Sequence, residues 1–168
     1  MFINLRPIID NRDFRLLYCG QAVSFFGSML TYVAIPYQIY ELTHSSFQVG
    51  LLSSVQLVPL LITALWGGAY ADVIDRRKLL VWSESLLALA SLILVASVYL
   101  KSAGVPLLFI VSGLMSAING FHRPALEALT PQLVRKEDLP AIAALGSLRF
   151  NLGAIGGPAV AGILIAKW

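Results

Sequence analysis

The chain has 168 residues, of which 58% are hydrophobic and 12% are charged, and its mean hydropathy is +0.79. Soluble domains contain roughly 45–50% apolar and about 25% charged residues, so this composition argues against a soluble fold. The net charge of +3 does not indicate a nucleic-acid partner, because the basic residues form no patch and stand at the ends of apolar runs.

Five apolar runs follow a polar N-terminal segment, and each has about the 20 residues that a helix needs to cross a bilayer. Residues 1–15 lack a small-residue cleavage site and are predicted to form a retained cytoplasmic tail. The runs are too long for the roughly 10-residue alternating strands of a barrel. The predicted fold is therefore an all-α membrane protein. Its transmembrane domain spans residues 16–168, with helices over residues 16–40, 49–71, 79–100, 105–126 and 139–166.

Basic residues near the span ends are divided unequally between the two sides of the predicted membrane. One side holds Arg6, Arg12, Arg15, Arg76, Arg77, Lys78, Arg135 and Lys136, whereas the other side holds Lys101 and Lys167. Loops rich in Lys and Arg stay in the cytoplasm. The distribution therefore predicts a cytoplasmic N-terminus.

The segment that joins the second and third spans has an acid at a helix end and three bases after it. Asp72 and Arg76 are four residues apart and can pair on one helix face, which would contribute about 0.3–0.5 kcal/mol. A simpler interpretation is that Arg77 and Lys78 only fix the topology. That interpretation explains Asp72 less well, because acids do little to set orientation.

The fifth span carries an unusual set of small residues around a proline. Gly153, Gly157 and Gly162 surround Pro158. Proline removes one helix hydrogen bond, and glycine allows helix backbones to approach each other. This pattern predicts a pliable helix that packs closely against a neighbour, and helix packing alone is the simpler interpretation of most of the glycines.

Arg149 lies about 15 Å into the fifth span, near the membrane midplane. An ionised group there costs roughly 2.5–3.5 kcal/mol on insertion scales, so it is a functional candidate. We expect Arg149 to face a central cavity and to contact an anionic substrate or a coupling carboxylate. The alternative is a structural partner, either Glu84 in the third span or a backbone carbonyl. Gln21 and Asn119 either line the same path or bridge helices through hydrogen bonds.

Metal and thiol chemistry find no support in the sequence. Cys19 is the single cysteine, which excludes an intrachain disulfide and a thiolate metal site. The two histidines, His44 and His122, are far apart in predicted depth, so we expect no metal site and no cofactor. The sequence also lacks a G-x-S-x-G elbow, an H-E-x-x-H pair and paired intramembrane aspartates, so we do not expect an enzyme.

The loop between the second and third spans resembles the major facilitator superfamily signature G-x-x-x-D-R-x-G-R-[RK]. Residues that match it are Gly68, Asp72, Arg76 and Arg77, whereas Val73 and Asp75 replace its first arginine and its glycine. In that superfamily the loop is implied to form a charged latch that holds the outward-open state. The loss of the first arginine changes which partner Asp72 can choose in such a latch.

The fifth span resembles the Gly-Pro antiporter motif of the drug and metabolite exporters in the same superfamily. The matching residues are Gly153, Gly157, Pro158 and Gly162. Residues 32–50 and 124–141 are similar to the enterobactin exporter and macrolide efflux branch. The resemblance covers essentially the whole chain and implies two six-helix halves around a central path, of which this sequence would be an incomplete N-terminal half.

The resemblance implies a truncated secondary active transporter in the bacterial inner membrane. It would export a small molecule such as a siderophore or a drug by alternating access, with protons as the coupling ion. The implied partners are membrane lipid, the substrate, protons and the remainder of the transporter. An uptake transporter of the same fold and a non-transporting remnant or subunit stay open as alternatives.

Overall fold

The structure, a computed structural model, describes residues 6–100 and 104–167, and it leaves the side chains of residues 69–73 undescribed. Lys101 and the side chain of Asp72 therefore lie outside the described residues. The described elements, in chain order, are α1 (Arg6–Asp10), α2 (Arg12–Thr43), α3 (Ser46–Val73), α4 (Arg76–Tyr99), α5 (Val105–Leu129), η1 (Thr130–Gln132), η2 (Lys136–Asp138) and α6 (Leu139–Ala166).

Every regular element in the described part of the chain is a helix, which confirms the predicted all-α class. Five of these helices are long and apolar enough to cross a membrane, as predicted. The helices extend beyond several apolar runs: α2 begins at Arg12, inside the predicted tail, and continues to Thr43. Hydropathy marks the hydrocarbon segment, whereas helical hydrogen bonds also continue through the polar interface.

Local polar contacts begin and end these helices. The Oδ1 atom of Asn11 accepts a hydrogen bond from the backbone N–H of Phe14 at 3.1 Å, just before the first turn of α2. At the other end of α2, His44 has a positive φ of 48° and turns the chain. Ser45 Oγ then accepts from the backbone N–H of Gln48 at the start of α3. Polar side chains thus set the turn between two long apolar helices.

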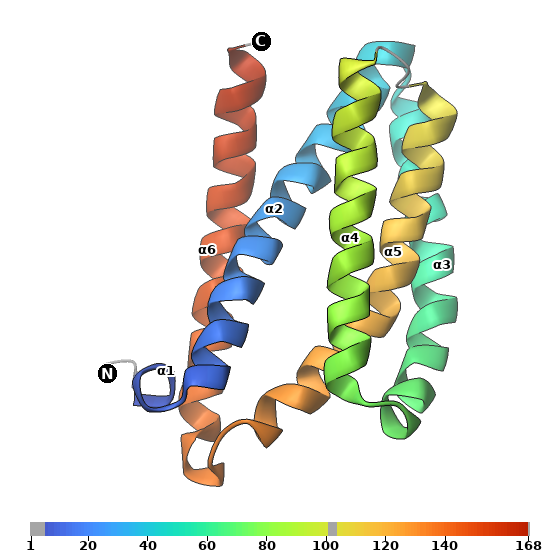
Figure 1. Cartoon of the computed structure of the whole chain (residues 1–168). Helices are drawn as coiled ribbons and strands as arrows, with labels where there is room; N and C mark the ends of the chain where they lie inside the picture. Colours follow the sequence, from blue (N-terminus) through green and yellow to red (C-terminus); the bar gives the residue numbers. More distant parts are fainter. Residues whose placement is uncertain (1–5, 101–103, 168) are drawn as a thin grey trace. The chain divides into compact units, whose positions relative to one another are not determined.

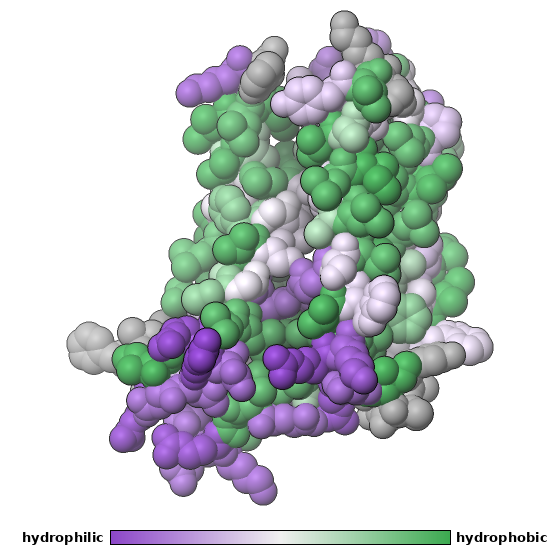
Figure 2. Space-filling view, in the orientation of Figure 1, coloured by the Kyte–Doolittle hydropathy of each residue, from purple (hydrophilic) through white to green (hydrophobic). Residues whose placement is uncertain are grey.

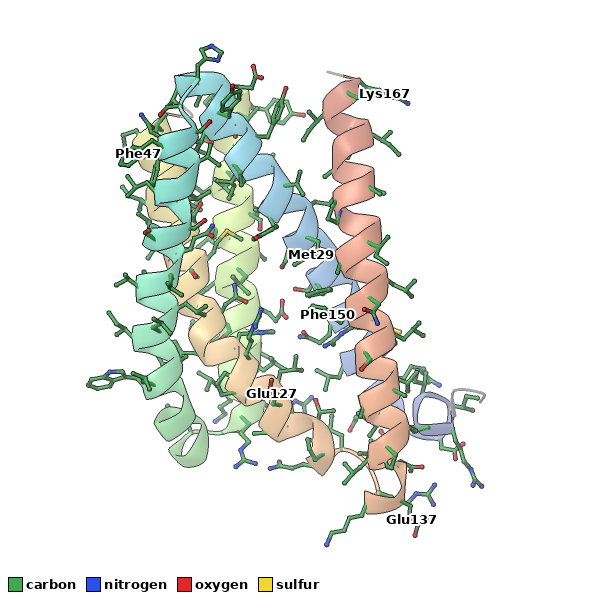
Figure 3. All side chains as sticks on the ribbon, turned by 180° about the vertical axis from the view of Figure 1, so that it is seen from behind. Met29, Phe47, Glu127, Glu137, Phe150 and Lys167 are labelled. Atoms are coloured by element: carbon green, nitrogen blue, oxygen red, sulfur yellow. The ribbon has the colours of Figure 1, made fainter. Side chains whose placement is uncertain are left out.

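The chain divides into two compact units, and α2 continues from one to the other next to Pro36. One unit comprises Met1–Ala34 and Leu129–Trp168, and the other comprises Ile35–Ala128. In the first unit, the first part of α2 and α6 run side by side in the same direction (Figure 1). Figure 3 shows Met29 of α2 and Phe150 of α6 along this pair, with Glu137 in η2 just before α6 and Lys167 just after the end of α6.

In the unit Ile35–Ala128, α3, α4 and α5 lie side by side (Figure 1). Its core is a small apolar cluster of Ile35, Ile39, Leu52 and Leu108, with Leu108 and Ile39 fully buried. Most other large apolar side chains are exposed, among them Leu65, Trp66 and Trp82. Apolar residues cover the length of the helices, and hydrophilic residues gather at helix ends in the lower part of the view (Figure 2). This is the pattern of helices with lipid as solvent.

Candidate functional site

The first part of α2 contacts α6 at successive levels. Tyr18 Oη donates a hydrogen bond to the Leu145 carbonyl at 3.1 Å. Two turns further along each helix, the ring of Phe25 lies against Gly153, and one more turn along, Met29 lies against Gly157. The two helices therefore keep a constant register over about three turns.

The glycines of α6 differ in what surrounds them. A Cβ atom at Gly153 would overlap the Phe25 ring, and one at Gly157 would overlap the Cβ of Met29. By contrast, a Cβ at Gly162 would meet no atom of the described residues within 4 Å. Close helix packing thus requires Gly153 and Gly157 but not Gly162. Pro158 lies inside the helix, between Gly157 and Gly162.

The same register brings two of the predicted path residues to one level. Arg149 is four residues after Leu145 and four before Gly153, so it shares their face of α6. Gln21 lies between Tyr18 and Phe25 on α2 and is only 6% exposed. Gln21 and Arg149 are therefore level with each other along the α2–α6 contact.

Arg149 places part of its guanidinium inside the protein. The Nε atom is buried and has no hydrogen-bond partner among the residues that the structure describes. An unsatisfied buried polar atom is costly, and more so when the group is charged. Arg149 thus has a donor available for an acceptor that lies outside the described residues.

In the loop between α3 and α4, the charged residues Asp72 and Arg76 are not arranged as expected from the sequence. Helix α3 ends at Val73 and α4 begins at Arg76, so Asp72 and Arg76 do not share one helix face. The expectation of a pair on a single helix was wrong, because Ile74 and Asp75 interrupt the helix. Gly68 lies inside α3, and a Cβ there would meet no described atom within 4 Å.

Asp75, which replaces the glycine of the loop signature, caps α4. Its Oδ1 accepts hydrogen bonds from the backbone N–H groups of Arg77 at 2.9 Å and of Lys78 at 3.4 Å. The capping role satisfies two helix donors that would otherwise be unpaired. An aspartate directly before a helix start is a capping signal, so the sequence contained the means to predict it.

Arg76 connects the loop to the end of another helix. Its Nη1 donates to the carbonyl of Ala128 at 3.4 Å, in the last turn of α5. A cation near a helix C-terminus interacts favourably with the helix dipole and with unpaired carbonyls. This contact gives one base of the loop a structural partner, while the side chain of Arg77 is exposed.

Between α4 and α5, Glu84 contacts a residue that the sequence had not linked to it. Glu84 Oε1 and His122 Nε2 are 2.8 Å apart. The two residues are 38 positions apart in the chain, so no spacing rule indicates the contact. Arg149, the predicted alternative partner of Glu84, belongs to the other compact unit.

Two polar residues of α5, Asn119 and Ser116, differ in the helix that they contact. Asn119 Nδ2 donates to the Met115 carbonyl of its own helix, so this amide group does not bridge two helices in the described part of the chain. Ser116 Oγ does bridge, because it donates to the Gln56 carbonyl of α3 at 2.7 Å. Within the described residues, no three His, Cys, Asp or Glu side chains are grouped as a metal ion requires.

Comparison with known families identifies this arrangement of helices. The model of the transmembrane secretion effector family matches residues 4–168, nearly the whole chain. The chain belongs to this family of the major facilitator superfamily. The predicted membership of the major facilitator superfamily is therefore confirmed, and the chain is a multi-pass membrane protein.

Individual relatives in the family are exporters by name. The chain is 30% identical to macrolide efflux protein A of Streptococcus pyogenes over 155 residues, which is 92% of this chain and 38% of the relative. It is 27% identical to the enterobactin exporter EntS of Salmonella paratyphi A over 165 residues, which is 98% of this chain and 40% of the relative. The chain thus spans about two fifths of the length of these relatives. No solved structure matches it.

Proposed function

We propose that the chain supplies five membrane helices of the N-terminal half of a secondary active exporter for a small molecule. The observation that carries the proposal is the partly buried guanidinium of Arg149, about 15 Å into α6, in a family whose named relatives export a macrolide and enterobactin. The substrate class is a siderophore or a drug, and export follows alternating access.

Arg149 is proposed to bind an anionic group of the substrate or a carboxylate that couples transport to ion flow. A guanidinium is always charged and presents several donors in a fixed plane, which suits a carboxylate or a similar anion. Its Nε atom already has no partner among the described residues. Gln21, at the same level of α2, is proposed to add a neutral hydrogen-bonding group beside Arg149. Asn119 and Glu84 are proposed as further residues for substrate or coupling ion.

Protons are proposed as the coupling ion, with membrane lipid and the rest of the transporter as further partners. The loop residues Gly68, Asp72, Arg76 and Arg77 are proposed to gate the cytoplasmic side. Two alternatives are kept, an uptake transporter of the same fold and a non-transporting subunit, because five helices of one half cannot enclose a path between two halves.

Efflux measurements on cells that express the complete open reading frame containing this sequence test the proposal. We expect retention of a labelled macrolide or a catecholate siderophore to fall when the protein is present. Arg149→Ala should reduce the efflux rate at least tenfold at an equal amount of membrane-inserted protein. Ser147→Ala is the matched control, since Ser147 is exposed on the same helix and donates only to the Ala143 carbonyl of that helix.

Each outcome of the efflux assay separates the alternatives. Efflux that Arg149→Ala leaves unaltered removes Arg149 from the mechanism. Accumulation instead of efflux favours uptake. A correctly inserted protein that moves no substrate favours the subunit, and a native mass measurement in detergent would then identify its assembly.

The proposed orientation in the bacterial inner membrane has the N-terminus in the cytoplasm. These 168 residues contain one cysteine, so Cys19→Ser leaves no native thiol within them. A membrane-impermeant thiol reagent should label Glu41→Cys, at the end of α2, in intact cells. It should label Lys78→Cys, at the start of α4, only after permeabilisation. Both positions are exposed in the structure, and the reverse result would invert the topology.

A further inference from the structure

The contact between Glu84 and His122 is short and largely shielded. Oε1 and Nε2 are 2.8 Å apart, and the side chains of His122 and Glu84 are 10% and 29% exposed. A carboxylate oxygen and an imidazole nitrogen this close need a proton on one of the two atoms, because two lone pairs repel each other. The pair therefore shares a proton within two membrane-spanning helices.

The charge of the pair depends on how many protons it holds. A neutral imidazole beside a carboxylate carries one negative charge, and one added proton makes the pair electrically neutral. Ionised groups inside a membrane are costly, whereas water stabilises them. Protonation of the pair is thus linked to whether the surrounding helices shield it or open it to water.

Elements packed near the pair differ in the ionisable groups that they contribute. Helix α3 approaches α5 at Gly67, beside Gly120 and Phe121, and residues 46–68 of α3 include no Asp, Glu, Lys, Arg or His. The side chain of Asp72, further along α3, is outside the described residues.

The pair's own helices carry further charges toward the same end. Helix α5 has Arg123 and Glu127, both exposed. Helix α4 has three bases in its first turn, roughly 9–12 Å along the helix from Glu84. Arg123 directly follows His122 and lies at nearly the same depth, whereas Glu127 and the bases of α4 lie nearer the helix ends.

We propose that Glu84 and His122 together bind the proton that drives transport, with Oε1 and Nε2 as the atoms that hold it. The inference rests on the proposed function of a proton-coupled exporter. Among the residues expected along the path, Gln21 and Asn119 do not titrate and Arg149 stays charged, so none of them can exchange a proton. The proton moves from water onto the pair and from the pair to water on the other side.

Nitrogen NMR of the histidine-labelled protein in lipid nanodiscs tests the proposal directly. The chain has two histidines, and the exposed His44 provides an internal reference. We expect the nitrogen signals of His122 to show the hydrogen bond between Nε2 and Glu84 Oε1. Glu84→Gln should change these signals, because an amide then replaces the carboxylate that the imidazole contacts. The His44 signals should stay the same.

Glu127→Gln is the matched control, because Glu127 is an exposed acid on the helix of His122. It should leave the His122 signals unchanged. Signals that show no hydrogen bond of His122 Nε2 in the wild-type protein overturn the proposal, and this measurement needs no variant to fold. His122 signals that Glu84→Gln leaves unchanged also overturn it.

A transport measurement connects the proton site to export and keeps it distinct from the proposed function. In proteoliposomes with the complete transporter, Glu84→Gln should lower substrate movement driven by a pH gradient at least tenfold while substrate exchange at equal pH persists. Undiminished gradient-driven movement would count against the proton site. If no substrate moves in the wild-type protein although the His122 signals show the hydrogen bond to Glu84, the proposed export fails and the proton-binding pair remains.

Discussion

Replacing Gly157 with alanine should weaken the contact between α2 and α6. The added Cβ would overlap the Cβ of Met29 and approach its Cγ and its backbone carbonyl carbon at 3.4 and 3.5 Å. These atoms belong to the base of the side chain and to the main chain, so a rotamer change cannot move them away. The helices must separate or shift along each other.

The expected cost follows from two opposing effects. Alanine is favoured over glycine in a helix by about 1 kcal/mol, and forcing a methyl group into a packed contact costs about 1–3 kcal/mol. Gly162→Ala gains the helix propensity of alanine without the packing cost, because a Cβ at Gly162 meets no described atom within 4 Å. The free energies of unfolding of the two variants should therefore differ by about 1–3 kcal/mol, roughly a 5- to 150-fold change in the equilibrium constant.

Equilibrium unfolding in mixed micelles of a mild detergent and sodium dodecyl sulfate measures this difference. Cys19 is exposed on α2 and is the single cysteine of the chain, so a fluorescent label there reports on the unit that contains the contact. Far-ultraviolet circular dichroism gives the helix content in parallel. Equal unfolding midpoints for Gly157→Ala and Gly162→Ala would refute the close approach of α2 and α6.

Three further substitutions test other contacts. Gly67→Ala should cost about 1–3 kcal/mol more than Gly68→Ala in the same unfolding assay, because only a Cβ at Gly67 would overlap the backbone of α5. Asp75→Ala should cost about 0.5–2 kcal/mol through loss of the α4 cap, whereas Asp75→Gly should cost a few tenths, as thermal unfolding would show. Tyr18→Phe removes the hydrogen bond to Leu145 and should cost about 0.6 kcal/mol, and a cost above about 2 kcal/mol would contradict a single ordinary bond.

The helical spans were predictable because each depends on local composition. A run of about 20 apolar residues can satisfy its backbone in lipid only as a helix, whatever its neighbours are. The helix ends were less predictable. Asn11 caps the start of α2, and Asp75 caps the start of α4. Both residues lie outside the apolar runs, so hydropathy does not predict the first turns of these helices.

Contacts between helices were predictable only in part. The glycines of the fifth span indicated close packing, but sequence spacing does not say which of them meets a neighbour, and Gly162 does not among the described residues. The contact of Glu84 with His122 was missed for the same reason. It depends on how two antiparallel helices slide against each other, and this register is set by packing over their whole length.

The register of α2 on α6 indicates which way the Arg149 side chain points, which its depth in the membrane alone does not. Leu145, Arg149, Gly153 and Gly157 recur every four residues and form one ridge of α6, and the ridge has contacts with α2 both before and after Arg149. A side chain on this ridge points toward the neighbouring helix rather than toward lipid, which explains why its Nε is buried. The glycines beside it bring the backbones close and restrict the space for the guanidinium. The packing motif of α6 and the candidate anion-binding arginine are therefore parts of one helix contact, and any change that separates these helices also alters the surroundings of Arg149.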